Sequence, residues 1–244
     1  MISRNQIKYI KDLGKKSFRA QEKAFVVEGE KLVDELLETT FEILDLFATA
    51  SWESRDTPKS VSIISDNELG RISQLKSPNK VLAVVKIPEV SNTNNRGEGL
   101  SIFLDRINDP GNLGTIIRMA DWFNIKHIYC SNESVDVYNH KVVQSSMGSV
   151  FRVHVSYVNP VSFLSDYTSK YPGNQIIGAA MNGEKLNETD LSKNALLIMG
   201  SESHGINPEL DSFINKQITI PKLGGAESLN VAVATGIILW ELNR

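Results

Sequence analysis

Short apolar runs alternate with helix-like stretches in the part of the chain that follows residue 100. Between these runs, apolar residues recur at helical spacing, as at Ile116, Ala120 and Phe123. Such alternation predicts a mostly parallel sheet with helices on both faces. The last helix, within residues 229–242, is apolar nearly all round, so we expect it to be deeply buried. The runs with the composition of strands are 101–105, 127–130, 151–155, 176–180, 196–200 and 217–221.

The first part of the chain carries a separate set of elements. A basic, helix-like segment precedes a helical run at 30–38 and strand-like runs at 24–29, 43–49, 61–65 and 81–87. Residues 88–99 are polar, contain glycine and show no periodicity, which is typical of a linker. We therefore predict a small α/β domain at 1–88, a linker at 89–98 and a larger α/β domain at 99–244.

The composition is that of an ordinary soluble protein, with 41% hydrophobic and 23% charged residues. The N-terminus lacks the apolar core of a signal peptide, and the longest apolar stretch is far short of the ~20 residues that span a bilayer. The single cysteine, Cys130, excludes an internal disulfide and a cysteine-built metal site. We expect a cytoplasmic protein with neither a metal nor a membrane partner.

Charge is distributed unevenly along the chain. Residues 1–23 hold seven Lys or Arg residues against Asp12 and Glu22, whereas the whole chain has a net charge of −3. A polyanion such as RNA would be attracted to this segment and find little general attraction elsewhere. The alternative is a solvated helix face with no partner. The residues that we expect to contact RNA here are Arg4, Lys8, Lys15, Lys16 and Arg19.

Three loops that follow predicted strands are rich in small and polar residues. They are "NDPGNLGTIIRMA" (108–120), "GSESHGINPEL" (200–210) and "PKLGGAESLN" (221–230). Functional residues of open α/β sheets gather at the carboxyl ends of strands. We therefore expect these three loops to form one site.

Common nucleotide and hydrolase sites do not match these loops. No G-x-G-x-x-G follows a strand, and Ile206-Asn207 stand where a phosphate loop needs Lys-Ser/Thr. "SESHG" is close to a nucleophile elbow, but the triad would need a histidine further along the chain, and the last one is His204. No two histidines have the spacing of metal ligands.

Taken together, the three loops resemble the three motifs of the SpoU/TrmH family of RNA 2′-O-methyltransferases. The first loop has the family's asparagine and glycine followed by an arginine, the second its glycine and glutamate, and the third its serine-leucine-asparagine before the last helix. The motifs occur in order, and the resemblance covers roughly residues 98–244.

The resemblance implies a SPOUT-type fold, in which the C-terminal segment threads through a loop to form a deep trefoil knot. It also implies a homodimer and S-adenosylmethionine as methyl donor. The cofactor is expected to be held largely by main-chain groups around Gly200, Ile220 and Leu229. Apolar and small residues would surround it, and the full expected set is Met199, Gly200, Ile220, Pro221, Gly225, Ser228 and Leu229.

For catalysis the resemblance points to Arg118, with Asn112, Glu202, Ser228 and Asn230 around it. Because a guanidinium stays protonated, we expect Arg118 to bind the RNA phosphate and stabilise charge on the ribose oxygen rather than act as a base. Glu202 would orient Arg118 through an ion pair. The alternatives are a surface pair of Arg118 with Asp121 and a simple N-cap role for Ser228.

The first domain resembles, more loosely, the L30e/L7Ae-type domains that several family members carry before the catalytic domain. The sequence therefore predicts an RNA ribose 2′-O-methyltransferase that acts on ribosomal or transfer RNA. Base methylation within the same knotted fold and a non-catalytic RNA-binding homologue remain the alternatives.

Overall fold

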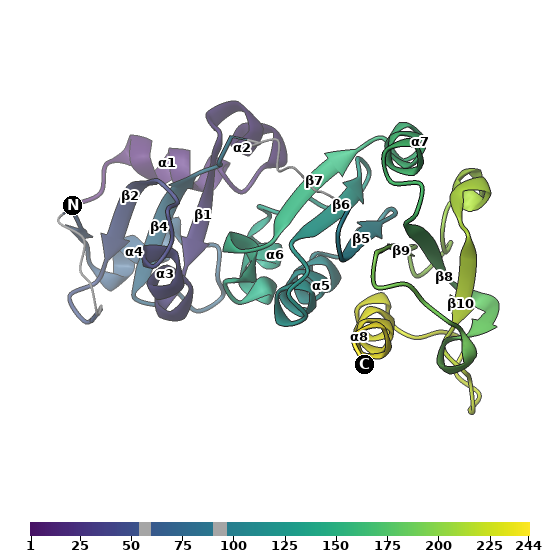
Figure 1. Cartoon of the computed structure of the whole chain (residues 1–244). Helices are drawn as coiled ribbons and strands as arrows, with labels where there is room; N and C mark the ends of the chain where they lie inside the picture. The colour runs from purple at the N-terminus through teal and green to yellow at the C-terminus, as the bar shows by residue number, and fades with distance from the viewer. Residues whose placement is uncertain (54–59, 90–96) are drawn as a thin grey trace. The chain divides into compact units, whose positions relative to one another are not determined.

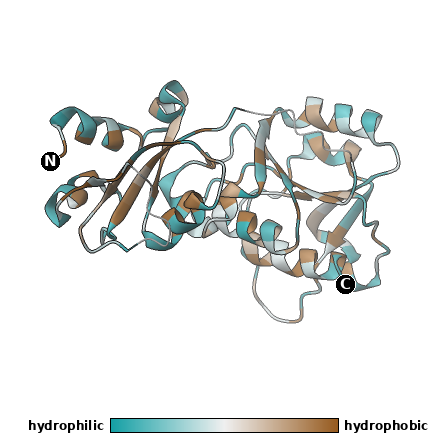
Figure 2. Cartoon of the chain, turned by 60° about the vertical axis from the view of Figure 1, so that its left-hand side comes forward, coloured by the Kyte–Doolittle hydropathy of each residue, from teal (hydrophilic) through white to brown (hydrophobic). Residues whose placement is uncertain are grey.

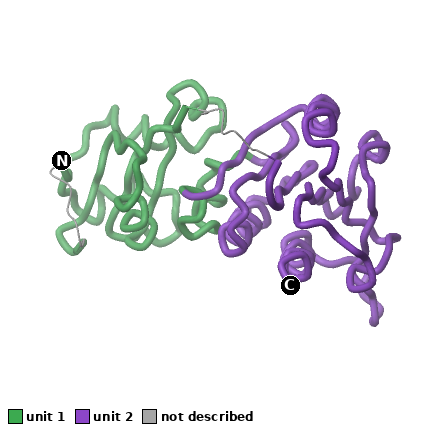
Figure 3. The backbone as a smooth tube through the Cα atoms, in the orientation of Figure 1, with its two compact units in different colours: residues 1–93, 136–151 green, residues 94–135, 152–244 purple. Residues whose placement is uncertain are grey.

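The computed structural model describes residues 1–53, 60–89 and 97–244, which form two compact units (Figure 3). Unit 1 comprises Met1–Thr93 and Asp136–Phe151, and unit 2 comprises Asn94–Val135 and Arg152–Arg244. Most of the predicted linker, residues 90–96, lies outside the described residues. The domain boundaries at 88 and 99 stay a prediction. The compact units divide the chain differently in one respect, because residues 136–151 belong to unit 1.

Unit 1 is built on a four-stranded mixed sheet. Its strands are β1 (Ala24–Glu28), β2 (Ile43–Ala48), β3 (Ser62–Ile63) and β4 (Val81–Lys86), in the order β1-β4-β2-β3. The central strand β4 runs antiparallel to both β1 and β2. All of β1 and nearly all of β4 are buried, so the sheet is covered on both faces.

Five short helices cover this sheet: α1 (Arg4–Asp12), α2 (Lys16–Glu22), α3 (Glu30–Leu37), α4 (Asp66–Ile72) and α6 (His140–Ser146). Ser3 and Ser65 begin α1 and α4 with capping boxes, which satisfy the first free N–H groups of each helix. Helix α6 packs on β1, where the rings of Phe25 and Tyr138 lie 4.5 Å apart. A segment far along the sequence therefore completes the core of unit 1.

Unit 2 contains a six-stranded sheet in which all neighbouring strands are parallel (Figure 1). The strand order β10-β8-β9-β5-β6-β7 places β5 and β9 in the middle. The predicted parallel sheet is confirmed. The run predicted at 151–155 begins at His154 instead, because Ser149–Phe151 form a 3₁₀ turn, η1. The strands are β5 (Leu100–Leu104), β6 (His127–Ser131), β7 (His154–Val158), β8 (Gln175–Lys185), β9 (Ala195–Met199) and β10 (Lys216–Thr219).

Helices cover both faces of this sheet. Leu164 and Tyr167 of α7 (Pro160–Lys170) pack with Phe103 of β5, and Leu210 of η3 (Pro208–Phe213) joins the same cluster. Ile102 alternates with Phe103 along the strand and is also fully buried, so the opposite face is covered as well. Figure 1 shows α7 on one side of the sheet, and α5 (Pro110–Trp122) and α8 (Val231–Leu242) on the other.

The expectation that α8 is deeply buried is only half right. Ile238 and Leu239 are buried, but Val233, Ile237 and Trp240 are 52%, 39% and 64% exposed. The helix contacts α5 and the short turn η2 (Leu186–Glu188), and these cover one side of it. Figure 2 shows hydrophobic residues along this helix, next to the C-terminus. Because the sequence of α8 is apolar on all sides, it did not show which face of the helix is covered and which is exposed.

None of the helices in the described ranges is long and apolar enough to cross a bilayer. Cys130 is fully buried in β6, where burial raises the pKa of its thiol well above the ordinary value. This cysteine is therefore a small core residue and not a reactive thiol.

Candidate active site

One hydrogen-bonded cluster joins residues from all three sequence motifs. Asn112 Nδ2 donates to Glu202 Oε1 at 2.9 Å, and Asn230 Nδ2 donates to the same oxygen at 2.8 Å. Asn230 Nδ2 also lies 3.0 Å from Asn112 Oδ1, which closes a triangle. The three residues are 90 and 28 positions apart along the chain. The structure thus brings together three of the five predicted catalytic residues, which we call the amide–carboxylate triangle.

Local sequence fixes each corner of the triangle. Asn112 lies in the first turn of α5, which begins with Asp109 as N-cap (Asn112 N to Asp109 Oδ1, 2.8 Å). Asn230 is the N-cap of α8, and its side-chain oxygen accepts from the N–H groups of Ala232 and Val233. Because Asn230 occupies the cap, the alternative N-cap role for Ser228 is excluded. Positions on a helix hold polar side chains more accurately than positions on a loop.

The third corner, Glu202, stands on a tight turn between Ser201 and Gly205. The two residues exchange main-chain hydrogen bonds of 3.1 and 2.8 Å. Gly200 precedes this turn so closely that a Cβ on it would lie 2.1 Å from the carbonyl carbon of Gly205. Glycine at 200 is therefore required by the turn itself, independently of its predicted role beside the cofactor.

Two residues that were not among the predicted site residues, Asp105 and Arg106, hold the turn of Glu202 in place. Asp105, at the end of β5, is 1% exposed, and its Oδ2 accepts from Asn207 N at 2.8 Å and from Arg106 Nε at 3.1 Å. Arg106 also donates to the carbonyl oxygen of Gly205. A buried carboxylate is costly unless its lone pairs are used, and here each bond ties down the loop that carries Glu202. The signal in the sequence was an aspartate directly after an otherwise apolar strand.

Arg118 lies on the outer face of α5 and is exposed. The alternative pair with Asp121 is not formed, since Asp121 binds Arg152 Nε at 2.8 Å. The predicted pair with Glu202 is also absent from the ion pairs of the described residues, and that prediction is wrong. Arg118 follows Asn112 by six positions, roughly 9 Å along the helix and about 240° around it, so the two face different directions. The guanidinium is left facing solvent.

The third motif forms an open loop. Residues 221–230, including Ser228, are all exposed, and a Cβ on Gly224 or Gly225 would meet no atom within 4 Å. Leu229 is 46% exposed, Ile220 is half-buried, and Met199 at the end of β9 is buried. Uncovered apolar side chains beside free main-chain groups suit the adenosine of S-adenosylmethionine, so the predicted cofactor residues fit that group. Pro221 and Gly225 lie in the same exposed loop.

The basic segment of unit 1 divides into exposed and buried residues. Arg4, Lys8, Lys15 and Lys16 are exposed, although Lys15 Nζ binds Asp12 at 2.8 Å. Arg19 does not fit its predicted RNA contact, because it is 3% exposed and forms an ion pair with Asp136.

The remaining donors of Arg19 bind the carbonyl oxygens of Leu13 and Gly14 at 2.8 and 2.9 Å. This arginine is therefore a structural residue, and charge counting could not distinguish it from its exposed neighbours.

The histidines take no part in the triangle. His127 and His154 lie on the neighbouring strands β6 and β7, and their rings stack with centroids 5.7 Å apart. The pKa of His127 is lowered, mainly by burial and also by the charge of His154. Within residues 1–53, 60–89 and 97–244, no group of three His, Cys, Asp or Glu residues is placed to hold a metal.

Comparison with known proteins identifies the family of the chain. The model of the SpoU rRNA Methylase family matches residues 99–240, and that of the MRM3-like substrate binding domain matches residues 4–83. Because the first match covers more than half of the chain, the protein belongs to the SpoU rRNA methylase family.

Two curated relatives illustrate the range of RNAs within the family. The chain is 31% identical to the Bacillus subtilis 23S rRNA (guanosine(2553)-2′-O)-methyltransferase RlmP, over 98% of this chain and 97% of the relative. It is 34% identical to the Aquifex aeolicus tRNA (guanosine(18)-2′-O)-methyltransferase, over 61% of this chain and 71% of that protein.

Two solved structures share the fold over nearly the whole chain. One is a Porphyromonas gingivalis structure in the TrmH family of RNA methyltransferases, with 38% identity and a TM-score of 0.89 over 99% of this chain and 98% of that chain. The other is an AdoMet-bound rRNA methyltransferase from Sinorhizobium meliloti, with 28% identity and a TM-score of 0.86 over 99% and 95% of the two chains.

Proposed function

We propose that this protein is an S-adenosylmethionine-dependent RNA methyltransferase that methylates a ribose 2′-hydroxyl in ribosomal RNA. The observation that carries the proposal is the triangle of Asn112, Glu202 and Asn230, which joins three separate motifs in one site. Ribosomal RNA is favoured over transfer RNA because RlmP, a relative matched over 97% of its length, acts on 23S rRNA. The enzyme would act in the cytoplasm, where that RNA is found.

Bound S-adenosylmethionine supplies an electrophilic methyl group on a sulfonium. Ile220 and Leu229 would hold its adenosine, together with main-chain groups around Gly200 and Gly225. The triangle holds the beginnings of α5 and α8 and the Glu202 turn at fixed positions. Preorganisation of this kind lowers the barrier because no reorganisation is needed during reaction.

Arg118 acts on the RNA. Its exposed guanidinium binds the phosphate next to the target ribose and stabilises the negative charge that develops on the 2′-oxygen as its proton leaves. Ser228 donates a hydrogen bond to the ribose, whereas Asn230, whose amide hydrogens are used within the triangle, holds the beginning of α8 in place. The 2′-O-methyltransferases among the relatives favour ribose over base methylation.

The finer features of the fold belong to the same proposal. In the proposed trefoil knot, the segment after β10 passes through a loop before α8 begins. The contact of α8 with α5 supports this, because Gly236 approaches α5 so closely that a Cβ would lie 2.8 Å from Met119 Sδ. The first domain acts as an L30e-like RNA-binding module, with Arg4, Lys8, Lys15 and Lys16 on the RNA.

A second copy of the chain covers the exposed stripe of α8 in this proposal. The stripe consists of Val233, Ile237 and Trp240, and Trp122 of α5 is 84% exposed one turn beyond Met119. Large apolar side chains gathered on one surface mark an interface. Trp240→Glu should therefore convert a dimer to a monomer in light scattering. The matched control is Leu223→Glu, which adds the same charge at a residue that is 100% exposed outside the stripe.

The experiment that tests the activity is a map of 2′-O-methylation and base methylation across total RNA, from cells with and without the gene. We expect one ribose methylation in ribosomal RNA to disappear and to return with the wild-type gene. Loss of a base methylation instead would establish the alternative enzyme. No change at any site, with purified protein inactive on unmodified ribosomal RNA, would contradict an enzymatic role.

A further inference from the structure

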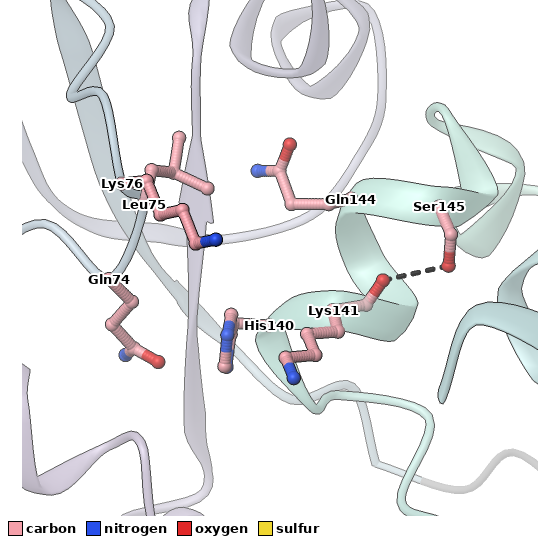
Figure 4. Close-up of a pocket in the computed structure, with 7 residues that line it drawn as sticks. All are labelled: Gln74, Leu75, Lys76, His140, Lys141, Gln144 and Ser145. Atoms are coloured by element: carbon pink, nitrogen blue, oxygen red, sulfur yellow. Dashed lines mark hydrogen bonds between the residues drawn. The ribbon is translucent and has the colours of Figure 1, made fainter. Parts of the chain in front are cut away.

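A hollow in unit 1 is lined by residues from two distant segments (Figure 4). One wall is the loop after α4, and the other is α6. The hollow has a volume of about 440 Å³, comparable to a nucleotide-sized ligand site. Its lining residues are Gln74, Leu75, Lys76, His140, Lys141, Gln144 and Ser145.

Glu28 anchors both walls of this hollow. Its buried carboxylate accepts from the hydroxyl of Ser73 and from Gln74 N at 2.8 Å, which fixes the loop. Its main-chain oxygen accepts from Gln144 Nε2 at 2.8 Å, which fixes α6. The two walls are thus held together by one residue at the end of β1, and the hollow is a built feature of unit 1.

The lining carries positive charge and no carboxylate. Lys76 and Lys141 are exposed, and neither has an ion-pair partner in the part of the chain that the structure describes. Figure 4 shows their ammonium groups on the two walls, with His140 between them. The pKa of His140 is lowered, first by burial and then by the charges of Lys141 and Arg19. Unpaired cations around a concave site favour an anion.

We propose that this hollow binds a backbone phosphate of the substrate RNA, at a nucleotide other than the one that is methylated. Lys76 and Lys141 neutralise the phosphate from opposite walls, and the amides of Gln74 and Gln144 contact the attached ribose. The inference rests on the proposed function, since it takes the partner to be the methylated RNA. One wall of the hollow, Gln74–Lys76, lies within residues 4–83, which match a substrate binding domain, and this supports RNA over a free small anion.

The test compares two double variants that remove the same charge. Lys76→Ala/Lys141→Ala alters the hollow, whereas Lys31→Ala/Lys193→Ala removes two exposed lysines that also lack ion-pair partners among the described residues. The probe is an unmodified ribosomal RNA transcript that the wild-type protein methylates, and its Kd is measured at several salt concentrations. All four lysines are exposed, so both variants should fold, which the melting temperature verifies.

We expect the hollow variant to bind this RNA roughly 10-fold more weakly and to lose about 0.7–0.9 from the slope of log K against log salt, as the loss of one phosphate contact predicts. The effect should fall on KM for RNA rather than on kcat. The control should change affinity less than about twofold, because long-range charge alone is screened. Equal slopes for the two variants would overturn the inference, as would an unchanged KM.

The outcome is distinguishable from failure of the proposed function. If the wild-type protein methylates no RNA, the activity itself is wrong. If the wild-type protein methylates RNA and the hollow variant behaves like the control, only the phosphate site is wrong.

Discussion

The two polar sites of this protein are organised in opposite ways. In unit 2, the side chains of Asn112, Glu202 and Asn230 bind one another at 2.8–3.0 Å. In unit 1, Lys76 and Lys141 face a hollow without an acidic partner in the described residues. Chemistry at a single atom requires fixed geometry, so its residues are bonded to each other. Attraction of a polyanion requires uncompensated charge, so its residues are left unpaired.

Removal of Arg118 should have the largest effect, because the proposed function places this residue on the reacting ribose although it is exposed like the lysines of the hollow. We expect Arg118→Ala to lower kcat by about 10²–10³, the usual cost of losing one donor that stabilises developing charge. S-adenosylmethionine should bind as in the wild type, since the cofactor residues lie in other loops. Single-turnover methyl transfer and calorimetric titration of the cofactor measure the two effects.

The control for this change is Arg71→Ala, on the last turn of α4 in unit 1, which removes the same charge from an exposed helix position. It should leave kcat unchanged. An Arg118→Ala enzyme with normal kcat would contradict the assignment, and the triangle alone would then have to account for catalysis.

Loss of Asp105 should have the next largest effect, because it supports the triangle without touching it. Asp105→Ala leaves the N–H of Asn207 and the guanidinium of Arg106 without their acceptor, which costs about 1–3 kcal/mol of stability. We expect kcat to fall together with the stability. Asp105→Asn retains an acceptor oxygen, so it should recover much of the lost stability and of the lost kcat. Chemical denaturation and steady-state kinetics measure these changes.

A double variant separates positioning from general damage. If Asp105 acts through the turn of Glu202, Asp105→Ala should lower kcat little further once Glu202 is already alanine. Additive losses in kcat would show that Asp105 acts by another route.

The sequence predicted the architecture of unit 2 and three residues that the structure brings together, but not the contacts of the other predicted site residues. Strand runs and motif order led to the parallel sheet and to Asn112, Glu202 and Asn230. The predicted ion pair of Glu202 with Arg118 was wrong, because motif spacing does not show which way each side chain of a helix points. A helix turns 100° per residue, so six residues carried Arg118 away from the face that bears Asn112.

Burial was the quantity that the sequence predicted least well. Arg19 counts as one basic residue among seven, yet it is the one whose guanidinium is enclosed by Leu13, Gly14 and Asp136. Its partner Asp136 is 117 residues away, in a segment that joins unit 1 only in the folded chain. Helix α8 shows the converse, because an apolar sequence left Trp240 exposed. Both depend on long-range packing that local patterns do not contain.

The triangle should respond to paired changes in a characteristic way. Asn112→Ala and Asn230→Ala should each lower kcat about 10-fold, and Asn230→Ala should also cost about 1 kcal/mol through the lost N-cap of α8. Because both amides donate to one oxygen of Glu202, the double variant should lose less than the sum of the two. Kinetics of all four members of this cycle measure the coupling. Strict additivity would mean that the two amides act independently.

The smallest effect concerns Glu28, the carboxylate that ties the walls of the hollow. Burial raises its pKa above the ordinary 4.5, against hydrogen bonds from Ser73 and Gln74 that lower it. A raised pKa in the folded state means that its protonated form is the more stable one there, so its contribution to stability is complete below pH 4.5 and is lost as pH rises through the folded pKa.

The stability advantage of the wild type over Glu28→Gln should therefore shrink between pH 4 and pH 7. Hydrogen exchange of the amides of β1 and β4 reports this difference within unit 1, whatever the stability of unit 2. An advantage that grew with pH would mean that the two hydrogen bonds outweigh burial. Glu28 would then resemble Glu202, a carboxylate that is stabilised by its hydrogen bonds. The contrast between a site of mutually bonded residues and a site of unpaired charges would then hold for Lys76 and Lys141, but not for Glu28, which supports the hollow.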